Sequence, residues 1–157
     1  MAQETGSTVE RGRVYRERRT WVSGAVAGIA GGAVMGVLLS VLLTPVIEVA
    51  IPALVGLSGG LAGWVVHMSI SAVFGVLFAA LVTLTPLADY TDRPLALVGV
   101  GLAYGAVLWI VAAGFVMPIW LSAVGFPMAP PVPNLNPTSL LVHLVFGAVV
   151  GLVYPYS

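Results

Sequence analysis

Residues 21–43 read WVSGAVAGIAGGAVMGVLLSVLL, and this stretch, which contains no charged side chain, decides the fold. A helix rises about 1.5 Å per residue, so a helix of this length crosses the hydrocarbon core of a bilayer, which is about 30 Å thick. Three further apolar runs follow, at residues 60–84, 95–117 and 138–154. The sequence therefore predicts an all-α integral membrane protein with four transmembrane helices.

The composition favours the same fold class. Of the 157 residues, 59% are hydrophobic and only 8% are charged, and the mean hydropathy is +1.06. A soluble domain has about 25% charged residues, so this chain lacks the charge to cover its surface in water. Its 19 glycines are typical of packed membrane helices, because small residues let helix backbones approach closely. We expect no nucleic-acid binding and, with no cysteine, no disulfide or thiolate metal site.

Proline and asparagine residues predict where the helices begin and end. Pro45, Pro86 and Pro118 follow the first three apolar runs, and each is expected to stop a helix, since proline lacks the N–H and clashes with the preceding turn. Asn136 and Pro137 precede the fourth run, where they are expected to be the N-cap and the first helical residue.

The arginines predict the orientation. Five of the six lie in residues 1–20, a polar tail expected to have no core of its own, ahead of a transmembrane domain at residues 21–157. The sixth, Arg93, lies between the second and third runs, and the chain has no lysine. Four crossings place the tail, the Arg93 loop and the C-terminus on one side, and the positive-inside rule makes that side cytoplasmic. We expect a multi-pass protein of the cell membrane with both termini in the cytoplasm.

The four runs resemble two copies of one helical hairpin. His67 and His143 lie 76 residues apart, and each begins the same pattern of small residues at every fourth position. The repeat predicts two parallel hairpins related by an axis along the membrane normal, although glycine-rich helices also look alike by chance. We expect helix contacts, within the chain or with a second copy, at the repeated glycines: Gly24, Gly28, Gly32, Gly36, Gly75, Gly101, Gly105, Gly147 and Gly151.

His67 and His143 are the only ionisable side chains within the predicted spans, besides tyrosine. Such groups are costly in a membrane and normally face the interior of a bundle, so we expect the two rings at one depth near the outer ends of their helices. Three interpretations stay open. Each ring bonds a backbone carbonyl or a nearby hydroxyl and fixes the packing; the pair ligates the iron of a b-type haem; or the pair relays protons or ions.

The two outer connections are apolar. Residues 46–59 carry a single charge, Glu48, and residues 119–137 carry none but contain five prolines. Apolar connections of this length are expected to be packed rather than free in water. They either cover the histidines as a roof or lie along the membrane surface as connectors. Glu48 is either a proton acceptor near the histidines or simply solvated.

The sequence indicates no enzyme. It contains no Ser/His/Asp set, no paired carboxylates, no phosphate-binding loop and no metal-spaced cluster, so we expect no catalytic residue and no metal beyond the possible haem iron. The favoured function is a non-enzymatic membrane module or subunit in contact with the lipid bilayer, with copies of itself or a larger membrane complex as the alternative partners. The alternative is a haem-binding or ion-handling bundle centred on the two histidines.

Three segments carry a resemblance to known proteins: GLAYGAVLW at 101–109, MP at 117–118 and SLLVHLVFG at 139–147. Over nearly the whole chain they resemble small four-span membrane proteins of halophilic archaea, some of which carry a histidine-kinase label. The C-terminal half is more distantly similar to YagU-like inner-membrane proteins. The resemblance implies four spans and no established activity. Kinase activity is not expected, because no segment outside the predicted spans exceeds about 20 residues, too short for a nucleotide-binding domain.

Overall fold

The computed structural model describes residues 2–157, with side chains from Thr20 onward. The described residues form helices and loops with no strand. In chain order the elements are α1 (Ala2–Leu42), the π-helix η1 (Val46–Ala50), α2 (Ile51–Ala53), α3 (Gly60–Thr83), the 3-10 helix η2 (Pro86–Tyr90), α4 (Pro94–Leu108), the π-helix η3 (Trp109–Val116), α5 (Met117–Ala123), α6 (Pro137–Val153) and the 3-10 helix η4 (Tyr154–Tyr156).

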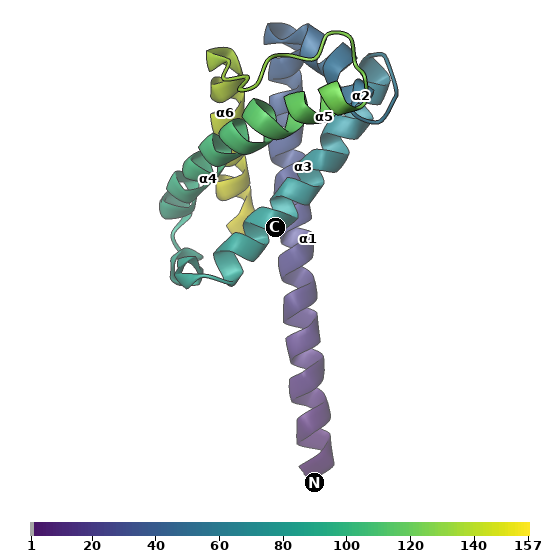
Figure 1. Cartoon of the computed structure of the whole chain (residues 1–157). Coiled ribbons are helices and arrows are strands. Elements are labelled where there is room, and N and C mark those ends of the chain that lie inside the picture. The colour runs from purple at the N-terminus through teal and green to yellow at the C-terminus, as the bar shows by residue number, and fades with distance from the viewer. Residues whose placement is uncertain (1) are drawn as a thin grey trace.

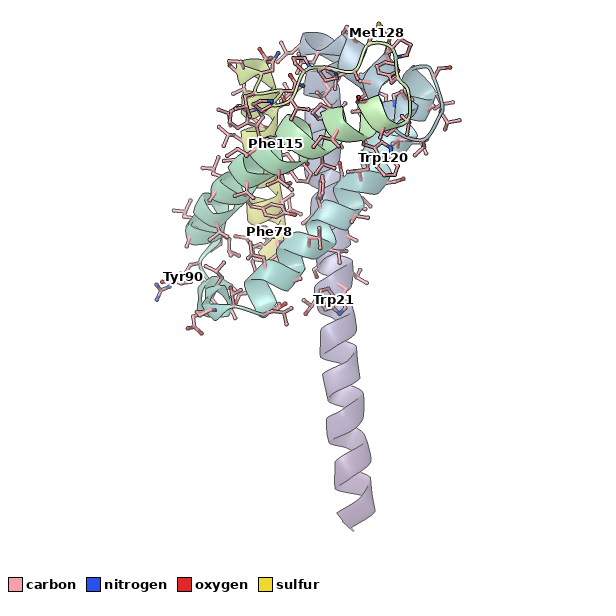
Figure 2. All side chains as sticks on the ribbon, viewed as in Figure 1. Trp21, Phe78, Tyr90, Phe115, Trp120 and Met128 are labelled. Atoms are coloured by element: carbon pink, nitrogen blue, oxygen red, sulfur yellow. The ribbon has the colours of Figure 1, made fainter. Side chains whose placement is uncertain are left out.

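Within the described chain, four helical segments are long and apolar enough to cross a membrane. They are Thr20–Leu42, Gly60–Thr83, Pro94–Ala123 and Pro137–Tyr156. Their outward faces carry large apolar side chains, which Figure 2 shows projecting from all sides of the bundle. Leu61 is 83% exposed and Leu95 is 88% exposed, a surface suited to lipid rather than to water. The prediction of an all-helical chain with four helices long and apolar enough to span a membrane is confirmed.

The third span is longer than predicted. The expectation that Pro118 ends it is wrong, because the helix runs on through α5 to Ala123. The π-helix η3 explains the continuation: Met117 N–H donates to Ala112 O, five residues back, and this wider turn precedes the proline. Pro118 has no N–H for the carbonyl of Gly114, four residues back, and that oxygen instead accepts from Asn134 N at 2.9 Å.

The helices pack as two hairpins. In one, α1 lies against α3, and in the other α4 lies against α6; α1 also packs on α6 and so joins them. By contrast, α3 and α4 make few direct contacts, and Figure 1 shows the loop that contains η2 joining them at the lower left. The N-terminal part of α1 projects away from the other helices. The predicted solvated, basic character of the tail concerns side chains 1–19, which lie outside the described residues.

Glycines bring the helices of each hairpin into backbone contact. A Cβ added at Gly75 on α3 would overlap Gly24 O and lie 2.6 Å from Gly28 Cα on α1. A Cβ added at Gly147 on α6 would overlap Gly101 O on α4. The other glycines expected at contacts also meet the partner helix of their hairpin: Gly32 lies against Ser71, Gly36 against Trp64, Gly105 against His143 and Gly151 against Leu97.

Two further close glycines were not expected from the sequence. Gly31 on α1 lies against Phe146 and Val150 of α6, and so makes the contact between the two hairpins. A Cβ added at Gly63 on α3 would overlap Ile47 O, where η1 packs on α3. Both lie outside the rows of repeated glycines, so spacing alone did not indicate them.

Aromatic side chains bridge the hairpins at the end away from η1. Phe78 is fully buried, and its ring centroid lies 5.4 Å from that of Tyr104 and 5.6 Å from that of Tyr154. Tyr104 Oη donates to Phe74 O at 2.8 Å, which links α4 to α3. This aromatic cluster holds the two hairpins together at one end of the bundle. The open space between α3 and the helix that runs from α4 through η3 to α5 lies at the opposite end.

Candidate functional site

That end of the bundle contains a cavity of about 700 Å³. It is bounded by α1, α3, η3 and α6, and by η1, α2 and the loop after α5. Its volume is typical of sites that hold small ligands, about 300–1,000 Å³. Most of its lining is apolar, and among the described residues no Asp, Glu, Lys or Arg lines it. The polar lining residues are His67, Ser71, Asn134, Asn136, Ser139 and His143.

His67 is buried on the face of α3 that meets α1. It is 5% exposed, and its Nε2 lies 2.9 Å from the carbonyl oxygen of Gly32. A carbonyl oxygen only accepts, so Nε2 carries the proton and donates it. The ring also packs edge-on against Trp64, with centroids 6.3 Å apart. These contacts hold the ring in place and leave Nδ1 without a partner among the described residues.

His143 lies two turns into α6, whose start is set by Asn136. The Asn136 side chain accepts from the N–H groups of Thr138 and Ser139, so the predicted N-cap is confirmed. His143 Nδ1 lies 2.7 Å from Ser139 O and donates to it. The ring thus leaves the opposite nitrogen, Nε2, without a partner.

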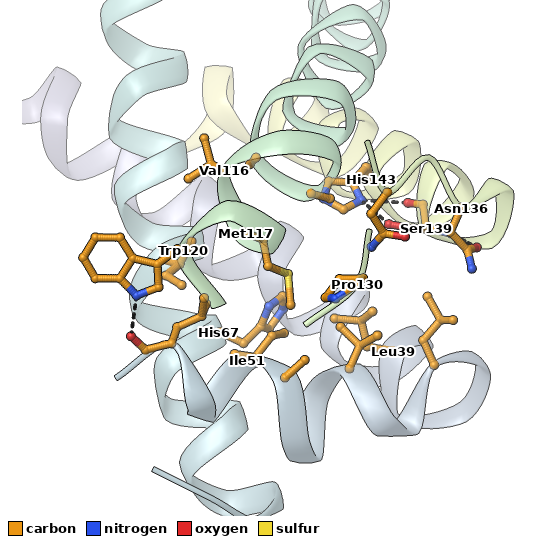
Figure 3. Close-up of a pocket in the computed structure, with 18 of the residues that line it drawn as sticks. Leu39, Ile51, His67, Val116, Met117, Trp120, Pro130, Asn136, Ser139 and His143 are labelled. Atoms are coloured by element: carbon orange, nitrogen blue, oxygen red, sulfur yellow. Dashed lines mark hydrogen bonds between the residues drawn. The ribbon is translucent and has the colours of Figure 1, made fainter. Parts of the chain in front are cut away.

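The structure brings both histidines to one cavity. Both side chains line it, and Figure 3 shows their rings together with Met117 and Pro130 in the cavity wall. Within the described chain, no fully buried side-chain nitrogen or oxygen lacks a hydrogen-bond partner. The unbonded nitrogens, Nδ1 of His67 and Nε2 of His143, are therefore accessible from the cavity. One of the three interpretations, a hydrogen bond from the ring to a backbone carbonyl, therefore holds for one nitrogen of each ring.

Ser71 adds a third polar group to the cavity. It is 3% exposed, yet its hydroxyl makes no hydrogen bond within the described chain. Ser40 and Ser69, by contrast, each donate to the carbonyl four residues back. Of the other nearby hydroxyls, that of Tyr104 bonds Phe74 O, whereas the Ser71 hydroxyl is free to meet a ligand.

The glycine contacts change how the two hairpins correspond. Gly28 approaches the carbonyl oxygen of Ser71, and Gly105 approaches that of His143. Ser71, rather than His67, therefore occupies the position that matches His143. His67 lies one helical turn away, and both positions of the first hairpin reach the cavity.

The outer connections form a roof over the cavity, which we define as η1, α2 and residues 124–136. Trp120 Nε1 donates to Leu54 O at 2.8 Å, and so ties α5 to α2. Trp109 Nε1 donates to Asn136 O at 3.1 Å, at the end of the proline-rich loop. The two interpretations were a roof over the histidines and connectors along the membrane surface, and these contacts favour the roof. Glu48 is exposed and does not line the cavity.

Within the described residues, no group of three or more His, Cys, Asp or Glu side chains is placed to hold a metal ion. Comparison with known protein families, curated proteins and solved structures finds no match for this chain. The sequence offered a roof over the histidines as one of two alternatives. It missed the role of the prolines at positions 52 and 118, which free carbonyl oxygens that accept from Gly59 N and Asn134 N.

Proposed function

We propose that this protein is a non-enzymatic module of the cell membrane that binds a small, mainly apolar molecule in the histidine-lined cavity. The observation that carries the proposal is the cavity, about 700 Å³ in volume and apolar apart from a few polar groups. A lining of this kind is typical of small-molecule sites, in which apolar side chains supply affinity and a few polar groups fix orientation. The module acts alone, as a homo-oligomer or as a subunit of a larger membrane complex.

We propose the same orientation as the arginines predict, with both termini in the cytoplasm and the roof on the outer side. Arg93 lies between η2 and α4, at the end of the bundle opposite the cavity, which supports this orientation. The ligand then sits in the outer half of the bilayer. Apolar molecules concentrate in the bilayer, so the cavity meets its ligand there.

We also propose that the chain arose by duplication of a hairpin. The close glycine crossings support it, and so does a shared device in the roof. Pro52 leaves Glu48 O without its helical partner, and that oxygen accepts from Gly59 N at 3.1 Å; Pro118 leaves Gly114 O free for the loop in the same way. Both short helices then end at a glycine with positive φ, 71° at Gly56 and 74° at Gly125.

The second candidate function is a b-type haem site or a proton or ion relay at the same two histidines. Its support is the unbonded nitrogen that each ring turns to the cavity, since an imidazole held through its other nitrogen by a carbonyl is oriented as metal ligands are. Two features weigh against haem. His67 offers Nδ1, which is crowded by its own Cβ, and no Arg or Lys lines the cavity to pair with haem propionates. An absorbance scan of purified protein decides this: a Soret band supports haem, and its absence after haem supplementation removes it.

The proposal is tested by filling the cavity. Ala112 lines the cavity, whereas the neighbouring Val111 is 51% exposed and points outward. We expect native mass spectrometry of the wild-type protein, extracted from its own membrane, to detect a bound apolar molecule. The Ala112→Phe variant is expected to lose it, while the matched Val111→Phe variant keeps it. Equal retention by both variants, or no bound molecule in the wild type, contradicts the proposal.

A further inference from the structure

We propose that the bound molecule is a hydrogen-bond donor, namely a lipid-soluble compound with free hydroxyl groups, such as a hydroquinone or a long-chain alcohol. This inference rests on the proposed function, because it concerns the same cavity. It is carried by the hydrogen bonds that the two histidines already make.

The first step is the position of the proton on His67. Its Nε2 faces Gly32 O at 2.9 Å and must donate to it. A neutral imidazole carries one N–H, so Nδ1, the nitrogen that faces the cavity, holds a lone pair and can only accept.

The second step is the same argument for His143, with the nitrogens exchanged. Nδ1 donates to Ser139 O at 2.7 Å, so Nε2 holds the lone pair that faces the cavity. Ser139 Oγ lies 3.4 Å from Nδ1, on the side already occupied by this bond, so it does not compete for Nε2.

The third step is that both rings are neutral. A positive charge on either ring would lie in an apolar cavity, where no carboxylate lines the wall to pair with it, and burying an unpaired charge is costly. The cavity therefore presents two acceptors from opposite hairpins. Neither has a proton to give.

The remaining polar groups do not reverse this preference. The Ser71 and Ser139 hydroxyls donate as readily as they accept, and the Asn134 side-chain amide offers both a donor and an acceptor. The Asn136 side chain, whose oxygen caps α6, offers its NH2 group as a donor. They can meet a hydroxyl or a carbonyl oxygen. A ketone or ether oxygen beside either imidazole, however, would set one lone pair against another and leave a buried acceptor unmatched.

The experiment measures ligand binding to the full chain in phosphatidylcholine nanodiscs, by isothermal titration. The four probes are decylubiquinol, kept reduced under argon, decylubiquinone, dodecanol and dodecyl methyl ether. We expect each hydroxyl compound to bind about tenfold or more tightly than its partner without the hydroxyl, a ratio that corresponds to about 1.4 kcal/mol. Tighter binding of the quinol than of dodecanol indicates a hydroquinone as the ligand, and the reverse indicates a chain alcohol.

The outcomes separate this inference from the proposed function. Equal binding of the hydroxyl and non-hydroxyl probes overturns the inference and leaves the proposed function standing. Binding of none of the four overturns both.

Two variants add a second measurement, the ratio of affinities within each pair of probes. A purely structural role of the residue would leave this ratio unchanged. His143→Gln introduces an amide N–H, so it is expected to reduce the preference for hydroxyl probes. Ser71→Ala removes a group that serves both kinds of probe, so it is expected to weaken both members of a pair and to preserve their ratio. Ser69→Ala is the matched control, because Ser69 is exposed and bonds Val65 O, and it leaves all four affinities unchanged. An unaltered preference in a folded His143→Gln variant contradicts the inference, and if that variant does not fold, the wild-type ratio still decides it.

Discussion

The backbone contact between α1 and α3 makes Gly75 intolerant of even one added carbon. In Gly75→Ala the new Cβ would overlap Gly24 O and lie 2.6 Å from Gly28 Cα, where carbon atoms normally stay about 3.5–4.0 Å apart. The helices must therefore separate by about 1 Å. A gap of that size forfeits about a quarter to a half of the attraction between the facing atoms, and overpacking of this kind costs about 1–3 kcal/mol.

We expect Gly75→Ala to lower the free energy of unfolding by about 1–3 kcal/mol. Gly99→Ala is the matched control, because a Cβ added at Gly99 meets nothing within 4 Å. That variant is expected to keep its stability or to gain up to about 1 kcal/mol from the higher helix propensity of alanine. The assay is unfolding by sodium dodecyl sulfate in mixed micelles, followed by tryptophan fluorescence. Equal stabilities of the two variants would refute the close crossing.

Two further predictions concern the two ends of the bundle. Tyr104→Phe removes the hydrogen bond to Phe74 O but keeps the ring contact with Phe78, so we expect it to lower the free energy of unfolding by about 1 kcal/mol in the same assay; an unchanged stability contradicts the link between α3 and α4. Trp120→Phe removes the bond to Leu54 O and loosens the roof, so amide hydrogen exchange in α2 is expected to accelerate about fivefold while exchange in α6 stays the same; uniform rates contradict the role of this bond.

The helices were predictable because their signals are local. A run of apolar residues long enough to span a bilayer needs no knowledge of its neighbours, and the cap at Asn136 depends on the next three residues only. The histidines were predictable as interior residues for a similar reason, since the membrane itself makes an outward-facing imidazole costly.

The cavity and its roof were predictable only as one of two alternatives, because they depend on contacts between distant parts of the chain. By local rules Pro118 is expected to stop a helix. Here the backbone N–H of Asn134 donates to the Gly114 carbonyl that the proline leaves free. Gly28 meets Ser71 O and Gly105 meets His143 O, whereas the spacing in the sequence paired His67 with His143. The space beside His67 is enclosed by segments that lie far apart in the sequence, and no local residue pattern indicates it.

The measurement that tests the central claim most directly is a crystal structure of the protein purified from its own membrane and crystallised from lipid. We predict electron density for a small apolar molecule between His67 and His143, with a hydroxyl oxygen within hydrogen-bond distance of Nδ1 or Nε2. A cavity that has closed, with side chains of α3 and η3 packed together and no room for a molecule, would contradict the account.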